Sequence, residues 1–328
     1  MFAPPAVAGD LVFVGSCSGT FYAIEWRTGQ SRWSYDIRQD GKQISFHGAI
    51  LIDKDVVLFD TDMSCAADGI GHVYAAEQGN GRILWKYRSA VGVSSNLLRA
   101  GSSVCFGTTS AEWGCLDPAS GKVRWKVAPV AGQKGCEMPI WADSDGERLF
   151  VVASDGAVVA LRASDGAVLW KRPLGARATT SPAVSQGVVH IGAADNRIYS
   201  LRAATGRVLH SVSVGGQPVG RPTLAQEGLF FLIERQTRPK GLLVALDRAG
   251  RKVKWSQEHP RSFASEQPHV WRDVVVVGDC AGAVKAFSLV DGTSRWQTDV
   301  TGCIRSVGSS PELLFFGAQE GMVYAVRP

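Results

Sequence analysis

The stretch Cys115–Trp125 reads CLDPASGKVRW, and this eleven-residue phrase recurs along the chain with its ends in register. Each copy opens on a small residue, carries a glycine near its middle and, with one exception, closes on tryptophan. The other copies are AIEWRTGQSRW (Ala23–Trp33), AAEQGNGRILW (Ala75–Trp85), ALRASDGAVLW (Ala160–Trp170), SLRAATGRVLH (Ser200–His210), ALDRAGRKVKW (Ala245–Trp255) and AFSLVDGTSRW (Ala286–Trp296). An eighth copy begins at Ala325 as AVRP.

Each phrase has the features of a strand, a tight turn and a second strand. The shared glycine, such as Gly29, suits a turn position that needs a positive φ angle. In the sixth copy the glycine is Gly250, one place early, so we expect that turn to differ. The closing tryptophan begins the outer strand, where its large side chain can cover the gap between repeats. His210 takes its place once, and looser packing is expected there.

Two further strands precede each phrase. Central strands are predicted by β-branched and aromatic runs such as GDLVFVGSCSG (Gly9–Gly19) and DVVVVGDCAG (Asp273–Gly282). Proline-containing stretches such as Ser181–Val184 predict an innermost strand, because proline is tolerated where a strand begins. The copies end about 40 to 52 residues apart, which suits four-stranded propeller blades.

The prediction is therefore an all-β, eight-bladed β-propeller with four-stranded antiparallel blades, formed by residues 1–328 as a single domain. The last blade is expected to lack its outer strand, because nothing follows Pro328 and residues 1–4 are too short to supply it. A segment missing upstream would also explain this. The alternative is a seven-bladed ring with a stray unit.

Composition and charge restrict the function. The chain is 45% hydrophobic and 20% charged, with a net charge of +5 and a pI of about 8.8. Its basic residues are spread along the sequence without a Lys/Arg run, which argues against a nucleic-acid partner or a membrane patch. No apolar segment is long enough to span a membrane. The N-terminus lacks the pattern of a signal peptide, so we expect a cytoplasmic monomer, or a periplasmic protein whose signal peptide was removed.

The seven cysteines are an odd number, without the spacing of a zinc site. Several of them lie in apolar strand patterns, where free cysteine behaves as a small buried hydrophobic residue. Free, buried thiols are the expected state. The positions are Cys17, Cys65, Cys105, Cys115, Cys136, Cys280 and Cys303.

The repeated phrase resembles the A-x-D-x-x-T-G-K-x-x-W tryptophan docking motif of pyrroloquinoline-quinone-like propellers, most closely at Cys115–Trp125 and Ala245–Trp255. The resemblance covers essentially the whole chain. It implies the fold and says little about function, because such repeats build quinone-dependent dehydrogenases, the outer-membrane assembly lipoprotein and the propeller of some adenylating, carrier-bearing enzymes.

Two of these relatives imply features that this sequence lacks. The dehydrogenases typically carry adjacent cysteines that form a vicinal disulfide over the quinone, and no two cysteines are adjacent here. They are also longer, and no Glu/Asn/Asp set stands out for their calcium. We therefore expect no cofactor. The assembly lipoprotein implies a signal peptide and a lipidated cysteine near the N-terminus, which this sequence does not show.

Aligning the innermost strands predicts a polar set of residues at one mouth of the central channel. Arg221 and Arg305 are candidate anion clamps, and Glu137 and Glu266 are candidate general acids or bases if burial shifts their pKa values. Alternatively, these charges pair with one another around a wet channel. The set at the mouth is His47 (or its neighbour Gly48), Asn96, Glu137, Thr180, Arg221, Glu266 and Arg305, and Arg177 is expected a little further out.

A second candidate is the loop Asp60–Gly71, which contains Asp60, Asp62 and Asp68. Alternating aspartates occur in calcium loops, but the acidic spacing of an EF-hand is missing. Turns stabilised by aspartate side chains explain the pattern better, so no metal site is predicted.

Two functions remain open. The first is a non-catalytic binding or scaffolding propeller that engages a protein partner or a carrier-linked small molecule at the channel mouth, through Asn96, Arg177, Thr180, Arg221 and Arg305. The second is a cofactor-independent cyclase, lyase or hydrolase that uses Glu137, Glu266 and His47 as catalytic groups. Paired charges favour binding, whereas a buried carboxyl with a raised pKa favours the enzyme.

Overall fold

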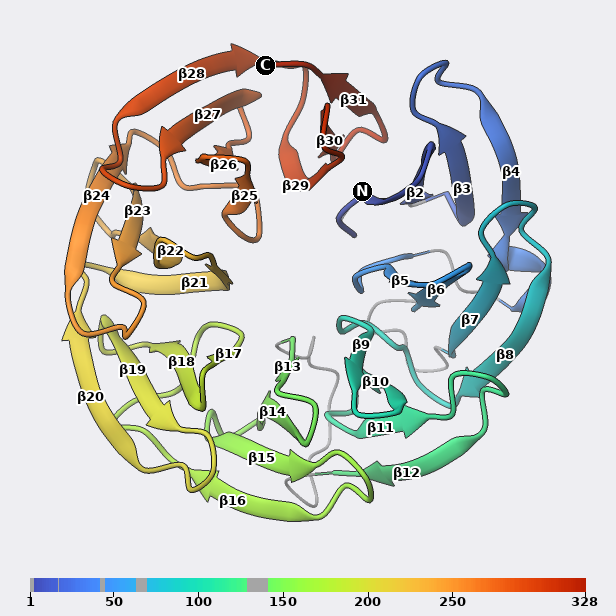
Figure 1. Cartoon of the computed structure of the whole chain (residues 1–328), viewed down its shortest axis with the longest axis horizontal. Coiled ribbons are helices and arrows are strands. Elements are labelled where there is room, and N and C mark those ends of the chain that lie inside the picture. Colours follow the sequence, from blue (N-terminus) through green and yellow to red (C-terminus); the bar gives the residue numbers. More distant parts are fainter. Residues whose placement is uncertain (1–2, 17, 42–44, 63–69, 129–140) are drawn as a thin grey trace. The chain divides into compact units, whose positions relative to one another are not determined.

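The computed structural model of the chain describes residues 3–16, 18–41, 45–62, 70–128 and 141–328. In these residues the strands form eight sheets, and each sheet consists of strands that follow one another along the chain (Figure 1). Seven sheets have four strands and the last sheet has three. The predicted fold class, an all-β eight-bladed β-propeller whose last blade lacks an outer strand, is confirmed.

The chain divides into two compact units. Unit 1 comprises Met1–Pro139, Ala163–Gly166 and Ser306–Arg327, and unit 2 comprises Ile140–Arg162, Ala167–Arg305 and Pro328. The first three blades lie in unit 1, together with most of the last blade, and the fourth to seventh blades lie almost entirely in unit 2. The proposal that residues 1–328 behave as one domain stays a prediction.

The strands of the first three blades and the last blade have the following bounds. The first blade has β1 (Ala6–Ala8), β2 (Leu11–Ser16), β3 (Thr20–Glu25) and β4 (Ser31–Asp36), followed by a short 3-10 turn, η1 (Ile37–Asp40). The second has β5 (Leu51–Asp53), β6 (Val56–Thr61), β7 (Gly71–Glu77) and β8 (Ile83–Ser89). The third has β9 (Leu98–Ala100), β10 (Ser103–Gly107), β11 (Trp113–Leu116) and β12 (Val123–Val127), and the last has β29 (Ile304–Ser309), β30 (Leu314–Ala318) and β31 (Val323–Val326).

The fourth to seventh blades repeat the same order. The fourth has β13 (Asp143–Ser144), β14 (Arg148–Val152), β15 (Val158–Arg162) and β16 (Val168–Arg172), and the fifth has β17 (Ala183–Ser185), β18 (Val188–Ala193), β19 (Arg197–Arg202) and β20 (Val208–Ser213). The sixth has β21 (Gln217–Leu224), β22 (Leu229–Glu234), β23 (Gly241–Leu246) and β24 (Val253–His259), and the seventh has β25 (His269–Trp271), β26 (Val274–Gly278), β27 (Ala283–Ser288) and β28 (Ser294–Asp299).

The repeated phrase forms the hairpin between the third and fourth strands of the first seven blades. Its opening residue pairs directly with its closing residue, as in Cys115 with Trp125 and Ala160 with Trp170, and the strand register shifts just after the opening residue. A small side chain at the opening position leaves room beside the large indole. The register shift is a β-bulge, which increases the local twist of the hairpin.

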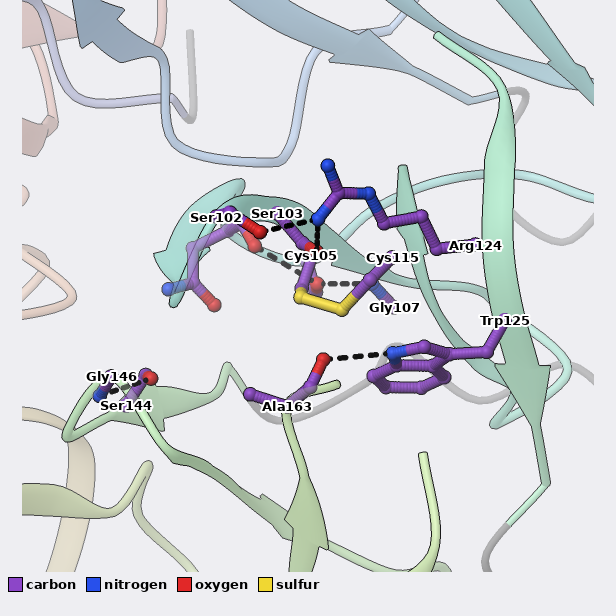
Figure 2. The surroundings of a disulfide bond; sticks show 12 residues. Ser102, Ser103, Cys105, Gly107, Cys115, Arg124, Trp125, Ser144, Gly146 and Ala163 are labelled. Atoms are coloured by element: carbon purple, nitrogen blue, oxygen red, sulfur yellow. Dashed lines mark hydrogen bonds between the residues drawn. A yellow bond between two sulfur atoms is a disulfide. The ribbon is translucent and has the colours of Figure 1, made fainter. Parts of the chain in front are cut away.

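The closing tryptophan packs on the hairpin of the following blade. The indole N–H of Trp125 donates to the carbonyl oxygen of Ala163 at 2.9 Å (Figure 2). Trp33, Trp85, Trp170 and Trp255 donate in the same way to Gln78, Pro118, Ala203 and Leu289. The indole hydrogen bond therefore joins each of these blades to the next.

His210 and Gly250 depart from this pattern less than we expected. Nε2 of His210 lies 2.9 Å from the carbonyl oxygen of Ala249, so the blade-to-blade hydrogen bond survives without the indole. Gly250 keeps a positive φ of 68°, although it comes one place early in the phrase. The neighbours of this turn do differ, because the α-carbon of Gly250 faces His190 and Ser200.

Apolar residues of adjacent sheets form the core between blades. In unit 1 the ring of Phe21 stacks on Phe59 with centroids 3.9 Å apart, and Phe59 stacks on Tyr74 at 4.8 Å. In unit 2 a comparable cluster contains Phe230 and Val275. These side chains come from the central strands, which are the most deeply buried elements of each blade.

Four cysteines form disulfides, so the prediction of free thiols is wrong for them. Cys105 of β10 lies directly opposite Cys115 of β11, and the two fully buried residues are bonded (Figure 2). Cys280 and Cys303, from two loops of unit 2, form the second bond. Disulfides persist in oxidising compartments and are rare in the cytosol. The remaining cysteines, Cys17, Cys65 and Cys136, lie outside the described residues.

Candidate functional site

In unit 2, the innermost strands bring four of the predicted site residues into one row. Thr180 forms a parallel bridge with Gly220, the residue before Arg221. The backbone N–H of Arg221 donates to the carbonyl oxygen of Glu266 at 2.8 Å. The backbone N–H of Glu266 donates in turn to the carbonyl oxygen of Arg305 at 3.2 Å. Neighbouring blades are therefore linked at their innermost strands, at the positions that the sequence alignment selected.

The side chain of Arg221 is enclosed by protein groups. Its Nη2 donates to Oε2 of Glu266 at 2.9 Å, and its guanidinium lies 2.9 Å from the centroid of the Trp141 ring. Burial lowers the pKa of Arg221 to about 10, and the Glu266 carboxylate opposes this shift. The charge of Arg221 is thus already matched by a carboxylate and an aromatic face.

Arg177, another predicted site residue, does not belong to this row. It is exposed, and its side chain packs against Gly156 in the turn between β14 and β15. Glu137 lies outside the described residues.

In unit 1, the predicted residue His47 and its neighbour Gly48 lie beside two buried aspartates. Nδ1 of His47 is 2.7 Å from Oδ2 of Asp62, whose side chain is fully buried. Gly48 approaches the Asp60 carboxylate and the carbonyl oxygen of Ser95, so closely that a Cβ at position 48 would collide with both. This contact brings the segment that contains Asn96 next to His47.

Asp60 is the most perturbed carboxyl of the described residues. It is 2% exposed, and none of the described residues donates a hydrogen bond to either of its carboxylate oxygens that meets ordinary geometry. Burial raises the pKa of Asp60 well above its usual value, and the neighbouring Asp62 raises it further. A carboxyl in this position favours the neutral, protonated form.

The sequence analysis missed a basic cleft in unit 2. The cleft has a volume of about 480 Å³ and is lined by Arg238, Lys240, Pro260, Arg261, Ser262, Phe263, Ala264, Cys280 and Arg305. Its four cations come from the β22–β23 loop, the β24–β25 connection and β29. A search for runs of Lys and Arg cannot find them, because folding brings these separate segments together.

Within the described residues, no cluster of three or more His, Cys, Asp or Glu side chains is arranged to hold a metal ion. No helix in the same residues has the length and apolar character needed to cross a membrane.

Comparison with known proteins identifies the family. The model of the PQQ_2 family, described as "Outer membrane protein assembly factor BamB", matches residues 2–138, 115–232 and 220–328. The outer membrane protein assembly factor BamB of Legionella pneumophila (strain Paris) is 26% identical over 181 residues. This alignment covers 55% of the chain and 45% of the relative, so the match spans less than half of the relative's length.

Solved structures show the same fold at low sequence identity. BamB from Moraxella catarrhalis superposes with a TM-score of 0.74 at 19% identity, covering 98% of this chain and 93% of that one. Quinohemoprotein alcohol dehydrogenase from Comamonas testosteroni gives a TM-score of 0.72 at 13% identity, covering 96% of this chain and 70% of that one. The predicted resemblance to quinoprotein-type propellers is confirmed.

These findings overturn the predicted location. The chain was expected in the cytoplasm, but the matching family and the Legionella relative are named for the assembly of outer membrane proteins. The two disulfides fit the same correction, because they are typical of an oxidising compartment. With its family model matched along the whole repeat array, the chain belongs to the PQQ_2 family, the family of the outer membrane protein assembly factor BamB.

Proposed function

We propose that this chain is a non-catalytic, protein-binding propeller that takes part in the assembly of outer membrane proteins. The observation that carries the proposal is the ion pair between Arg221 and Glu266. Arg221 was one of two candidate anion clamps and Glu266 one of two candidate general acids or bases, and their side chains pair with each other. The family description supports the assembly role.

The side chains of Arg221 and Glu266 are held in a link between neighbouring blades. Nη2 of Arg221 donates to Oε2 of Glu266 at 2.9 Å, and the backbone N–H of Arg221 donates to the carbonyl oxygen of Glu266 at 2.8 Å. The row therefore resembles a structural link between blades, and the surfaces around it are available for a protein partner.

Deletion of the gene in its own organism tests the assembly role. We expect lower amounts of outer membrane proteins in the isolated envelope, measured by quantitative mass spectrometry, and recovery when the wild-type chain is restored. Cytoplasmic proteins serve as the internal control. Unchanged outer membrane protein levels in the deletion strain would contradict the proposal.

A cofactor-independent enzyme remains the second candidate because of Asp60. A buried carboxyl with a raised pKa beside the His47–Asp62 pair provides a proton donor next to an oriented imidazole. Asp60→Asn separates the two functions, because it preserves the shape of the side chain and removes its titratable proton. The binding proposal expects this variant to restore outer membrane protein levels fully, whereas an enzyme that uses Asp60 would lose its activity.

A further inference from the structure

We propose that the basic cleft of unit 2 binds a segment of a protein partner in which acidic and apolar side chains alternate. This inference rests on the proposed protein-binding function and adds the chemistry of the partner. The cleft is lined by Arg238, Lys240, Arg261, Arg305 and the apolar residues between them. Neither Arg221 nor Glu266 lines it, although the backbone N–H of Glu266 donates to the carbonyl oxygen of Arg305.

The cleft is positively charged. Four of the nine residues that line the cleft carry positive charge, and none of the nine carries negative charge. Arg238 and Lys240 are exposed and form no ion pair with the residues that the structure describes. Like charges placed together repel one another, so an anion that enters the cleft relieves this repulsion.

Arg261 has an acidic neighbour, which offsets part of the positive charge of the cleft. Nη1 of Arg261 lies 3.5 Å from Oδ2 of the fully buried Asp279, which also faces His259 at 3.8 Å. Arg261 is 62% exposed at its side chain, so it can contact Asp279 and still reach a ligand. Arg238 and Lys240 therefore provide the uncompensated charge of the cleft, and Arg261 adds to it from an exposed position.

The cleft also has apolar surface between its cations. Phe263 is partly buried and packs on His259 with ring centroids 5.0 Å apart, while Pro260 and Ala264 flank it. A volume of about 480 Å³ lies within the usual range of ligand pockets. A free phosphate or a nucleic-acid backbone makes no use of apolar residues, whereas a peptide with alternating acidic and apolar side chains satisfies both components.

Anisotropy titration with a labelled hexapeptide that alternates Glu and Leu tests the inference. The matched peptide replaces each Glu with Gln, so that it keeps the shape and loses the charge. We expect the acidic peptide to bind at least about tenfold more tightly, and to weaken as salt is raised, because charge-assisted contacts to arginine are screened by salt. Equal binding of the two peptides would overturn the proposal.

Charge-changing variants test whether the acidic peptide binds in the cleft. The charge reversal Arg238→Glu with Lys240→Glu should weaken the acidic peptide at least about tenfold. The milder pair Arg238→Gln with Lys240→Gln should weaken it less and guards against misfolding. Arg251→Glu with Lys252→Glu changes two exposed cations in the β23–β24 turn of the same blade and should have little effect. Equal weakening by this control pair, or no weakening by the cleft variants, would contradict the assignment.

Further results test the choice of a peptide as the ligand and distinguish failure of the cleft proposal from failure of the proposed assembly function. Single-stranded DNA that binds more tightly than the acidic peptide, and loses binding in the cleft variant, would overturn the choice of a peptide. Absence of peptide binding in a protein whose deletion lowers outer membrane proteins would refute the cleft inference and leave the proposed function in place. Peptide binding without any effect of deletion would support the cleft and refute the assembly role.

Discussion

The indole ring of Trp170 lies against the α-carbon of Gly206 in the following blade, and its N–H donates to the carbonyl oxygen of Ala203 at 2.9 Å. A Cβ on Gly206 would come within 2.6 Å of the indole ring. The glycine of the repeated phrase therefore has two functions, since it adopts a positive φ and also leaves space for the tryptophan of the preceding blade.

Substitution of this glycine tests the packing. Gly206→Ala should lower the free energy of unfolding through both backbone strain and the collision with Trp170. Gly29→Ala is the matched control, because Gly29 has a similar φ of 73° and nothing within 4 Å of its Cβ position. The control should cost about 1–2 kcal/mol from strain alone, and Gly206→Ala about 1–3 kcal/mol more from overpacking. Equal losses in urea unfolding would contradict a packing role for the indole.

The ion pair at the innermost strands should stabilise the fold. Glu266→Ala leaves the buried Arg221 without its carboxylate and should cost about 1–3 kcal/mol in urea unfolding. Glu266→Gln retains an acceptor and should cost less. The control is Glu258→Ala, which removes the partner of Arg235 from a pair whose carboxylate is 60% exposed, and should cost about 0–1 kcal/mol. A larger loss for Glu258→Ala than for Glu266→Ala would refute this account.

The disulfides should stabilise the protein under oxidising conditions. Their sequence separations are 10 and 23 residues, and loops of this size correspond to about 3 kcal/mol each in the chain-entropy description. Cys105→Ala with Cys115→Ala, and Cys280→Ala with Cys303→Ala, should each lower the unfolding free energy by about this amount. Reductant should then have a smaller effect on each variant than on the wild type. Variants as stable as the oxidised wild type would show that the bonds do not form.

Acid should destabilise the fold through two buried histidines. Burial lowers the pKa of His190 and of His269 from 6.5 to about 4. Between these values the unfolded state binds protons that the folded state does not, so the stabilisation is complete above pH 6.5 and is lost as the pH falls toward 4. Each histidine accounts for about 3 kcal/mol. His190→Gln should flatten the dependence of unfolding free energy on pH in this window, and a profile that superposes on the wild type would contradict the assignment.

The repeated phrase determined how much of the fold could be predicted. Its spacing located all eight blades, and the small residue opposite each closing tryptophan, such as Ala160 opposite Trp170, follows from the hairpin register. The alignment of innermost strands selected Thr180, Arg221, Glu266 and Arg305, and backbone contacts join the segments of these residues in the structure; their place at a channel mouth stays a prediction. Local periodicity was sufficient for these features because each depends on residues of one repeat or of adjacent repeats.

Features that depend on the exact strand register, or on the meeting of distant segments, could not be read from the sequence. The Cys105–Cys115 bond requires the exact pairing of β10 with β11, and the odd number of cysteines concealed it. The cleft combines Arg238 with Arg261 and Arg305, which are far apart along the chain. The contact between Arg221 and Trp141 likewise joins two blades that are not adjacent in sequence. The pairing of Arg221 with Glu266 was foreseen only as an alternative to a catalytic site.

The most direct test of the central claim, that this propeller acts by binding and not by catalysis, is complementation with two of the candidate acid–base groups removed. The double variant Glu266→Gln with His47→Gln retains hydrogen-bonding side chains at both positions and loses their acid–base chemistry. Its folding is checked first by urea unfolding. The account predicts that it restores outer membrane protein levels in the deletion strain as fully as the wild type. A folded variant that is produced at wild-type levels and fails to restore them would contradict the account and favour an enzyme.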